Sequence, residues 1–359
     1  MSRTAYLILE NGTVFEGTAF GAEKETIGEL VFSTAMTGYL ETITDPCYFG
    51  QVVMQTFPLI GNYGVIPADL ESDSPSLKGY IVREWCQVPS NFRSEGDLDT
   101  FLRESGIPGI CGIDTRALTR IIREYGVLNC KISYSPDVTD ELLAELKNYK
   151  VTGAVQSTTI KQTEQKSSDN AELNVVDMDF GSRTGIDSEL IQRGCNLTIV
   201  PASTTAQEIL ALNPDGVMLS NGAGDPAENT EVVEELKKLS ENKIPMFGIS
   251  LGHQLLALSQ GAKTEKLKYG HRGANQPVKE LATGKVYITS QNHGYIVVND
   301  SIPNTAEVTF VNGNDGSCEG ISYTEIPAFS VQFLPEISGG PHDSAFLFDR
   351  FIKMMKDNK

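Results

Sequence analysis

The second half of the chain alternates between short apolar runs and segments whose apolar residues recur every three or four positions. Apolar runs of this length predict buried strands, and the longer period predicts amphipathic helices. The predicted strands are residues 173–180, 196–202, 216–224 and 244–249, and the predicted helices are residues 186–194, 204–212 and 229–242. This alternating order predicts a parallel sheet with helices on both faces. From residue 285 onward strands dominate the pattern, and a final helix is predicted over 344–356.

The first 150 residues show a different pattern of short strands, many turn residues and a few helical segments. Residues 5–9 predict a strand, and Asn11-Gly12 predicts a tight turn into a second strand, which together make a hairpin. Helices are predicted over residues 97–105, 113–123 and 139–148. We therefore predict an α+β domain over residues 1–150.

A polar segment separates the two patterns. Residues 151–172 are rich in Ser, Thr, Gln and Lys and offer little apolar surface to bury. They predict a linker, so the second domain is expected over residues 173–359. The fold class of the whole chain is α/β, with an α+β domain first and a parallel-rich sheet flanked by helices second.

Composition and charge exclude several classes of function and location. The net charge of −18 argues against a general binder of nucleic acid or of anionic membranes, because both need a basic face. No apolar run approaches the roughly 20 residues that span a bilayer, and the N-terminus lacks the pattern of a secretory signal. The six cysteines are scattered without a CxxC pair, which predicts reduced thiols and no zinc site. We expect a cytoplasmic protein.

Candidate chemistry gathers where predicted parallel strands end. Residues 248–252 fit the pattern G-x-S-x-G, in which a serine is presented on a tight strand-to-helix turn. Ser250 is either a nucleophile or a serine packed in that turn. The Gly-rich turn 222–226 follows the preceding strand and could point backbone N–H groups at a ligand. Ligands bind beyond the carboxyl ends of such strands, so both turns should face one crevice.

Other polar residues are weaker candidates when each is taken alone. Residues 291–295 place amide side chains between β-like runs, and Glu336 is an isolated carboxylate at the end of another run. The chain also contains the order Ser250, Asp315, His342, which is formally that of a serine hydrolase. With four histidines in the chain, chance alone can supply that order.

Taken together, these segments resemble a known family, the small glutamine-hydrolysing chain of carbamoyl phosphate synthase. The first domain carries the resemblance in LENGTVFEGTAFGA, GELVFSTAMTGYLETITDP and GIPGICGIDTRALTRIIRE. The second carries it in LSNGAGDP, FGISLGHQLLALSQ, GHRGANQPV, SQNHGY and FSVQFLPEISGGPHD. The resemblance implies a small-chain N-terminal domain followed by a class I glutamine amidotransferase domain.

The resemblance also implies an activity and a partner. In that family a cysteine on the turn attacks the side-chain amide of glutamine, a histidine serves as its base, and a glutamate orients the histidine. Ammonia then passes through a tunnel to a large chain, which uses ATP, magnesium and bicarbonate to make carbamoyl phosphate for arginine and pyrimidine synthesis. The implied partner is that large chain, in a heterodimer. No cofactor and no metal are expected on the small chain itself.

Aligned with the family's motifs, this sequence departs where the chemistry occurs. Ser250 stands at the position of the cysteine, and Leu334 at that of the histidine, while Glu336 is kept. Cys47 replaces a serine that contacts glutamine in the first domain, and Ala223 replaces a proline in the Gly-rich turn. The positions kept from the implied glutamine site are Gly222, Gly224, Leu251, Gln254, Asn292, Gly294 and Tyr295.

These departures predict a weak or lost glutaminase. A serine hydroxyl needs a base within hydrogen-bond reach, and Leu334 cannot accept a proton. His253, one helical turn past Ser250, is carried by the family beside the usual base and is interpreted as structural. The chain is then expected to act as a structural or regulatory subunit of an ammonia-using synthase. The alternatives are an active amidotransferase with Ser250 as nucleophile, and a serine hydrolase built on the G-x-S-x-G turn.

Overall fold

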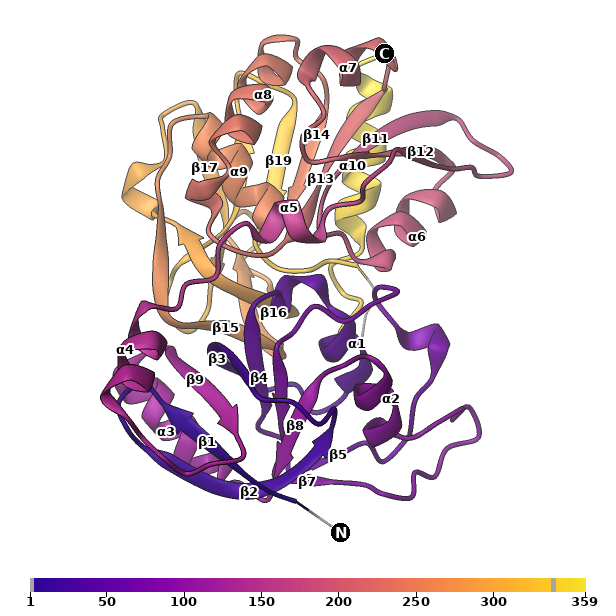
Figure 1. Ribbon diagram of the computed structural model, residues 1–359. Helices are drawn as coiled ribbons and strands as arrows, with labels where there is room; N and C mark the ends of the chain where they lie inside the picture. Colours follow the sequence, from indigo (N-terminus) through magenta and orange to yellow (C-terminus); the bar gives the residue numbers. More distant parts are fainter. Residues whose placement is uncertain (1–2, 337–339) are drawn as a thin grey trace. The chain divides into compact units, whose positions relative to one another are not determined.

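The computed structural model describes residues 3–336 and 340–359. The chain divides into two compact units, Met1–Val151 and Thr152–Lys359 (Figure 1). Within the described ranges, no helix combines the length and the apolar character needed to cross a membrane.

The first unit is built around a closed barrel with strand order β1-β2-β8-β6-β4-β3-β9. The barrel strands are β1 (Thr4–Leu9), β2 (Val14–Gly21), β3 (Thr26–Ser33), β4 (Gln51–Gln55), β6 (Gly79–Ile81), β8 (Pro108–Cys111) and β9 (Leu128–Ser133). A separate pair contains β5 (Leu59–Ile60) and β7 (Glu84–Trp85). The helices are α1 (Tyr39–Thr44), α2 (Leu98–Glu104), α3 (Thr115–Tyr125) and α4 (Asp140–Asn148), with short 3₁₀ turns at Pro46–Tyr48 and Pro67–Asp69.

The predicted N-terminal hairpin is confirmed, because β1 and β2 pair antiparallel from Thr4↔Thr18 to Ile8↔Val14. Gly12 supplies the positive φ of 84° that the turn requires. The three predicted helices correspond to α2, α3 and α4. Asp114 caps α3 by accepting a hydrogen bond from the Ala117 N–H at 2.9 Å.

The second unit contains one ten-stranded sheet with order β10-β12-β11-β13-β14-β19-β18-β17-β15-β16. Its strands are β10 (Glu164–Lys166), β11 (Leu173–Phe180), β12 (Cys195–Pro201), β13 (Gly216–Gly222), β14 (Met246–Ile249), β15 (Thr264–Glu280), β16 (Val286–Val297), β17 (Ala306–Asn312), β18 (Cys318–Tyr323) and β19 (Ala328–Val331). From β12 to β19 the neighbours are parallel, and from β19 to β16 they are antiparallel.

Helices cover both faces of this sheet, as the alternating pattern predicts (Figure 1). They are α5 (Ala154–Thr158), α6 (Thr184–Gln192), α7 (Ala206–Ala211), α8 (Thr230–Glu241), α9 (Leu251–Ser259) and α10 (Phe346–Asp357), with 3₁₀ turns at Pro226–Glu228 and Asn299–Ser301. Val176 and Met178 of β11 join the apolar core that includes α7, α8 and α9. Leu173 and Val175 join the core that includes α6 and α10. This alternation along one strand is what a sheet buried on both faces requires.

The segment predicted as a polar linker, residues 151–172, contains regular structure instead. It includes α5 and β10, and β10 pairs antiparallel with β12 from Glu164↔Ile199 to Lys166↔Leu197. Backbone pairing at a sheet edge needs no apolar side chains, so a polar composition did not prevent a strand. From Thr152 onward this segment belongs to the second unit.

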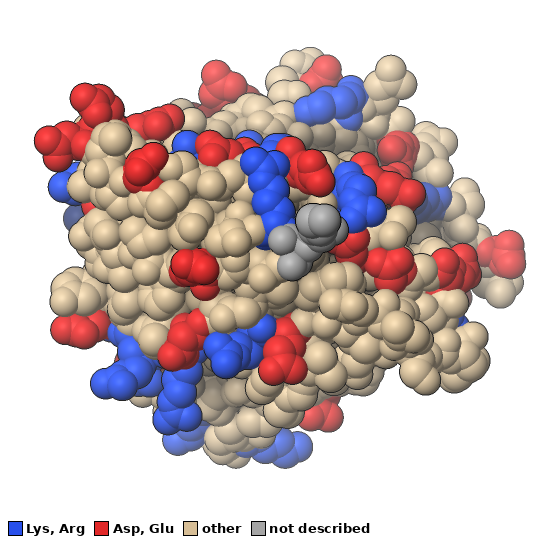
Figure 2. Space-filling model, turned by 60° about the horizontal axis from the view of Figure 1, so that its bottom comes forward, with Lys and Arg blue, Asp and Glu red and all other residues tan. Residues whose placement is uncertain are grey.

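Charged side chains of both signs are interspersed on the surface. On the face drawn in Figure 2, blue Lys and Arg side chains lie among red Asp and Glu side chains. In α8, Lys237 pairs with Glu234 at 2.6 Å and Lys238 with Glu235 at 2.7 Å. Exposed pairs of this kind contribute roughly 0–1 kcal/mol each, so they serve solubility more than stability.

Candidate functional site

Ser250 lies on a tight turn between β14 and α9, in the second unit. Its backbone has φ 52° and ψ −105°, which makes it one of few described non-glycine residues with a positive φ. The Ser250 N–H donates to the Val331 carbonyl at 2.8 Å, and the residue is buried. The strand, the strained residue and the helix therefore form the turn that the G-x-S-x-G pattern predicts.

The glycines of the pattern are required by packing. A Cβ on Gly252 would collide with the backbone carbonyl of Leu219 in the neighbouring strand β13. A Cβ on Gly248 would lie 2.8 Å from the carbonyl oxygen of Gly252. Any side chain at either position would push α9 away from the sheet, so the two glycines set how closely the helix approaches it.

The Gly-rich turn after β13 lies beside the Ser250 turn, because β13 and β14 are parallel neighbours. A Cβ on Gly222 would lie 2.7 Å from Leu251 Cδ2, so these two predicted site residues are in contact range. Gly224 has a φ of 92°, and Ala223 is buried. The structure thus brings the two turns together at the carboxyl edge of the sheet, as expected for parallel strands.

Gln254 connects α9, the helix that follows Ser250, to β16. Its side-chain Nε2 donates to the Tyr295 carbonyl at 2.7 Å and to Gln332 Oε1 at 2.9 Å. Asn292 and Gly294 lie on the same strand as Tyr295. Four of the predicted glutamine-site positions are therefore linked through one buried amide and the strand that it binds.

Leu334 and Glu336 follow β19, which pairs in parallel with β14 from Met246↔Ala328 to Ile249↔Val331. Leu334 is buried in the apolar core, and its N–H donates to the Ser290 carbonyl at 2.9 Å. Glu336 is also buried, with Oε1 3.9 Å from Nη1 of Arg183. Arg183 follows β11, and its N–H donates to Asn221 Oδ1 at 3.2 Å.

Within the described ranges, no histidine of the second unit forms a hydrogen bond with the Ser250 side chain. His253 is fully buried with its Nδ1 2.8 Å from Ser330 Oγ, and burial lowers its pKa to about 3. His293 is buried too, and burial holds its pKa well below the usual range. Asp315 Oδ2 lies 2.9 Å from His271 Nε2, while His342 is exposed. Within residues 3–336 and 340–359, the Ser250 hydroxyl has no hydrogen-bond partner.

Cys47 belongs to the first unit. It is buried in the 3₁₀ turn Pro46–Tyr48, and its N–H donates to Asp45 Oδ1 at 2.9 Å. This hydrogen bond is the N-cap of the 3₁₀ turn, so the Asp45 side chain stabilises the segment that contains Cys47.

Sequence reasoning missed two members of this region. Arg183 carries a charge that faces Glu336, but it follows the predicted strand 173–180 and no local pattern marks it. Gln332 accepts a hydrogen bond from the Gln254 amide and is buried. For Gln332 the available signal was a polar residue within an otherwise apolar β-like run.

Two protein-family models match the chain. The one described as "Carbamoyl-phosphate synthase small chain, CPSase domain" matches residues 7–132, and the one described as "Glutamine amidotransferase class-I" matches residues 174–354. A glutamine amidotransferase structure from Thermotoga maritima aligns with 52% of this chain and 83% of its own, at 17% identity and a TM-score of 0.38.

Curated relatives match along the whole chain. The carbamoyl phosphate synthase small chain of Fusobacterium nucleatum subsp. nucleatum is 52% identical over 98% of both chains. The small chain of Staphylococcus epidermidis (strain ATCC 12228) is 51% identical over 100% of this chain and 98% of its own. This chain therefore belongs to the carbamoyl phosphate synthase small chain family, with a small-chain N-terminal domain and a class I glutamine amidotransferase domain.

Proposed function

We propose that this chain is the small subunit of a carbamoyl phosphate synthase in which the glutaminase step is weak or lost. It would pair with a large chain that supplies the ATP, magnesium and bicarbonate chemistry and uses free ammonia. The observation that carries the proposal is Leu334, an apolar side chain buried in the core where the family places the base.

The nucleophile supports the proposal first. A cysteine reacts as its thiolate, whereas a serine hydroxyl stays protonated unless a base removes its proton in the reaction. The Ser250 hydroxyl makes no hydrogen bond to an imidazole or a carboxylate in the described ranges. Its position on a strained turn presents the hydroxyl but does not activate it.

The base position supports it next. Leu334 has no atom that can take a proton, and Glu336, the family's orienting carboxylate, faces the Arg183 guanidinium instead. Loss of nucleophile or base in a comparable triad lowers turnover by about a millionfold, and the two losses are not additive. With both positions changed, we expect hydrolysis of glutamine close to background.

The other histidines offer no replacement that the geometry favours. His253 is one helical turn from Ser250, but its Nδ1 is occupied by Ser330, and a pKa of about 3 makes it a weak base. His293 is held between Tyr295 and Gln291, with Nδ1 and Nε2 at 2.9 and 3.0 Å from their oxygens.

Residues suited to an amide ligand are kept near Ser250. Gln254 is oriented by two hydrogen bonds, and Gly222 and Gly224 pack so closely against Phe180, Leu251 and Ala154 that a side chain at either position would displace the turn. We therefore propose that glutamine can still bind weakly. The remaining role of the chain would be to complete and regulate a cytoplasmic large chain in arginine or pyrimidine synthesis.

The test compares the natural chain with the revertant Ser250→Cys/Leu334→His, each with the large chain added. Glutamate release from glutamine and carbamoyl phosphate formation from ammonia are measured side by side. We expect only the revertant to release glutamate, and both to support the ammonia reaction equally. Comparable glutamate release by the natural chain would contradict the proposal.

The same assay separates the two alternatives. If Ser250 works as an amidotransferase nucleophile, Ser250→Ala abolishes a measurable glutamine turnover by the natural chain. If the chain is a serine hydrolase, a fluorophosphonate probe labels Ser250. Asp315 pairs with His271 and not with the exposed His342, so the formal order Ser250, Asp315, His342 gains no support from the contacts.

A further inference from the structure

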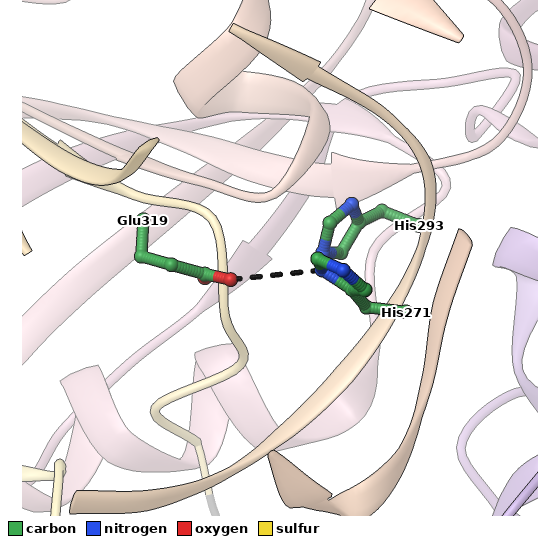
Figure 3. Close-up of side chains that lie close together, drawn as sticks. All are labelled: His271, His293 and Glu319. Atoms are coloured by element: carbon green, nitrogen blue, oxygen red, sulfur yellow. Dashed lines mark ion pairs between the residues drawn. The ribbon is translucent and has the colours of Figure 1, made fainter. Parts of the chain in front are cut away.

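A buried cluster of two histidines and one glutamate lies outside the residues used above. His271 of β15, His293 of β16 and Glu319 of β18 point toward one another, and one donor atom of each lies within 4.8 Å of the others (Figure 3). All three residues are buried, and Glu319 is completely so. They come from three different strands, so no sequence spacing announces them.

The outer contacts of each histidine fix which nitrogen faces the cluster. His271 Nε2 lies 2.9 Å from the Asp315 carboxylate, so this nitrogen carries the proton, and the lone pair of Nδ1 faces Asn312 Nδ2 at 3.4 Å. His293 Nδ1 and Nε2 lie 2.9 and 3.0 Å from the oxygens of Tyr295 and Gln291, so a neutral ring donates to one of them and turns a lone pair toward the other; with Nδ1 as the donor, Nε2 keeps the lone pair. Metal-bound histidines are held in this way, with the second nitrogen bound to a carboxylate or a backbone carbonyl.

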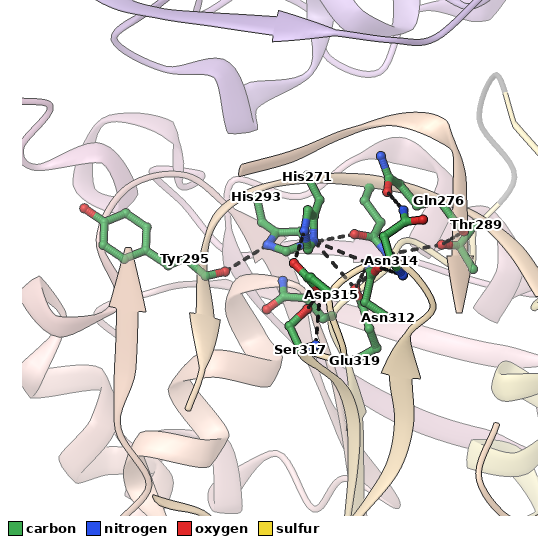
Figure 4. A network of polar contacts seen from close by, with 12 residues as sticks. His271, Gln276, Thr289, His293, Tyr295, Asn312, Asn314, Asp315, Ser317 and Glu319 are labelled. Atoms are coloured by element: carbon green, nitrogen blue, oxygen red, sulfur yellow. Dashed lines mark hydrogen bonds and ion pairs between the residues drawn. The ribbon is translucent and has the colours of Figure 1, made fainter. Parts of the chain in front are cut away.

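Electron-rich atoms therefore converge on one point. The lone pair of His293 Nε2 faces Gln291 Oε1 at 3.0 Å, which sets two acceptors against each other. His271 Nδ1 lies 3.8 Å from Glu319 Oε1, which already accepts from Gln291 and Asn312 at 2.9 and 2.8 Å (Figure 4). Glu319 Oε2 is buried and has no hydrogen-bond partner within residues 3–336 and 340–359.

We propose that His271, His293 and Glu319 form a binding site for a divalent transition-metal ion of the zinc class. Two imidazoles and one carboxylate are an established ligand set for Zn²⁺, and Gln291 Oε1 or water could take the fourth position. A cation between these atoms removes the conflict between His293 and Gln291. It also compensates the charge of a carboxylate that is fully buried.

The ion would fasten the antiparallel half of the sheet. β15 and β16 pair with each other, and the backbone of β18 reaches them through β17. An ion bound by all three strands would add to the direct side-chain link that Gln291 of β16 already makes to Glu319 of β18. Because Tyr295 shares its carbonyl between His293 and Gln254, this link would also steady the strand that contacts α9.

Arg272 is the buried cation next to His271 in β15, and its charge is one of the causes that hold the pKa of His293 below its usual range. Its Nη1 donates to the Tyr269 carbonyl at 2.9 Å.

The test uses the untagged full chain, stripped with a chelator and titrated with Zn²⁺ and with Co²⁺. We expect one ion per chain by calorimetry and visible d–d absorption from Co²⁺. At a free Zn²⁺ concentration about 100 times the dissociation constant, we expect the melting temperature to rise by roughly 5–10 °C. Absence of stoichiometric binding would overturn the proposal and leave a hydrogen-bonded network, with a proton resolving the His293–Gln291 contact.

Variants locate the ion. His271→Gln and Glu319→Gln should abolish binding, whereas His342→Gln and Glu325→Gln change the same residue types at exposed positions and should leave it unchanged. Asp315→Asn changes the outer partner of His271, which also accepts from Ser317, and should weaken binding by about 10–100-fold. Binding that survives His271→Gln in a folded chain would place the ion elsewhere, for example on the half-buried thiols of Cys86 or Cys111, and would overturn the proposal.

Discussion

The backbone at Ser250 gives a quantitative test of the elbow geometry. With φ 52° and ψ −105°, Ser250 occupies a region that crowds a Cβ and suits glycine. Holding a residue there costs about 1–3 kcal/mol. Ser250→Gly removes this strain, but its more flexible unfolded chain offsets about 0.5–1 kcal/mol of the gain. Relative to Ser250→Ala, which keeps the strain, Ser250→Gly should raise the unfolding free energy by up to about 2.5 kcal/mol.

Thermal unfolding of the full chain measures this difference. For a unit of 150–250 residues, 1 kcal/mol shifts the melting temperature by about 2–4 °C, so Ser250→Gly should melt above Ser250→Ala, by up to roughly 10 °C. Ser188 is the matched control, because it is exposed in the middle of α6. There glycine should be the less stable variant by about 1 kcal/mol. If Ser250→Gly melts at or below Ser250→Ala, the strain argument is wrong.

Three further outcomes follow from packing and protonation. Gly252→Ala should destabilise the chain by about 1–3 kcal/mol or more, because the added Cβ meets a backbone carbonyl that cannot move aside. Gly96→Ala is the control, because its Cβ would lie 3.9 Å from the nearest atom, and it should change the stability by no more than about 0.5 kcal/mol. The denaturant midpoints of the two variants measure the difference. Leu334→Ala should cost about 2–5 kcal/mol in the same assay, and a smaller loss would mean that Leu334 is not core. The pKa of His253 is lowered to about 3 in the folded chain, so its contribution to stability is complete above pH 6.5 and is lost as the pH falls toward 3. The unfolding free energy should therefore fall by about 1.4 kcal/mol per pH unit from this group, and His253→Gln should remove that slope; an unchanged slope would contradict the lowered pKa.

Segments with a strong hydrophobic periodicity allowed most helices and parallel strands to be predicted. The run 173–180 became β11 with the same limits, and the period over 229–242 became α8. The strand β15 was not predicted, since TEKLKYGHRGANQPVKE is largely polar and lacks a regular alternation. Its register shifts twice against β16, and backbone pairing with β16 and β17 holds it in place. Partners distant in the sequence supply that information, so local pattern could not.

In the candidate site, too, local features could be predicted from the sequence and contacts between distant segments could not. The position of Ser250 could be predicted because G-x-S-x-G describes a local turn, and the parallel order brought residues 222–226 beside it. The pairing of Arg183 with Glu336 could not, because a long flexible side chain chooses its partner only after the strands are assembled. The orientation of His271 and His293 likewise depends on Asp315 and on the Tyr295 carbonyl, which belong to other turns of the chain.

The persistence of the G-x-S-x-G pattern therefore says more about packing than about catalysis. Gly248 and Gly252 are fixed by contacts with backbone carbonyls, which are the same whether or not a nucleophile stands between them. Under the proposed function, activity depends instead on single side chains, above all the one at position 334, where leucine is buried in the apolar core. The proposal is therefore that this chain keeps the fold and the tight turn at Ser250 without an efficient glutaminase reaction. Glutamate release by the Ser250→Cys/Leu334→His revertant is the measurement that separates these two layers, because the fold is the same on both sides of the comparison.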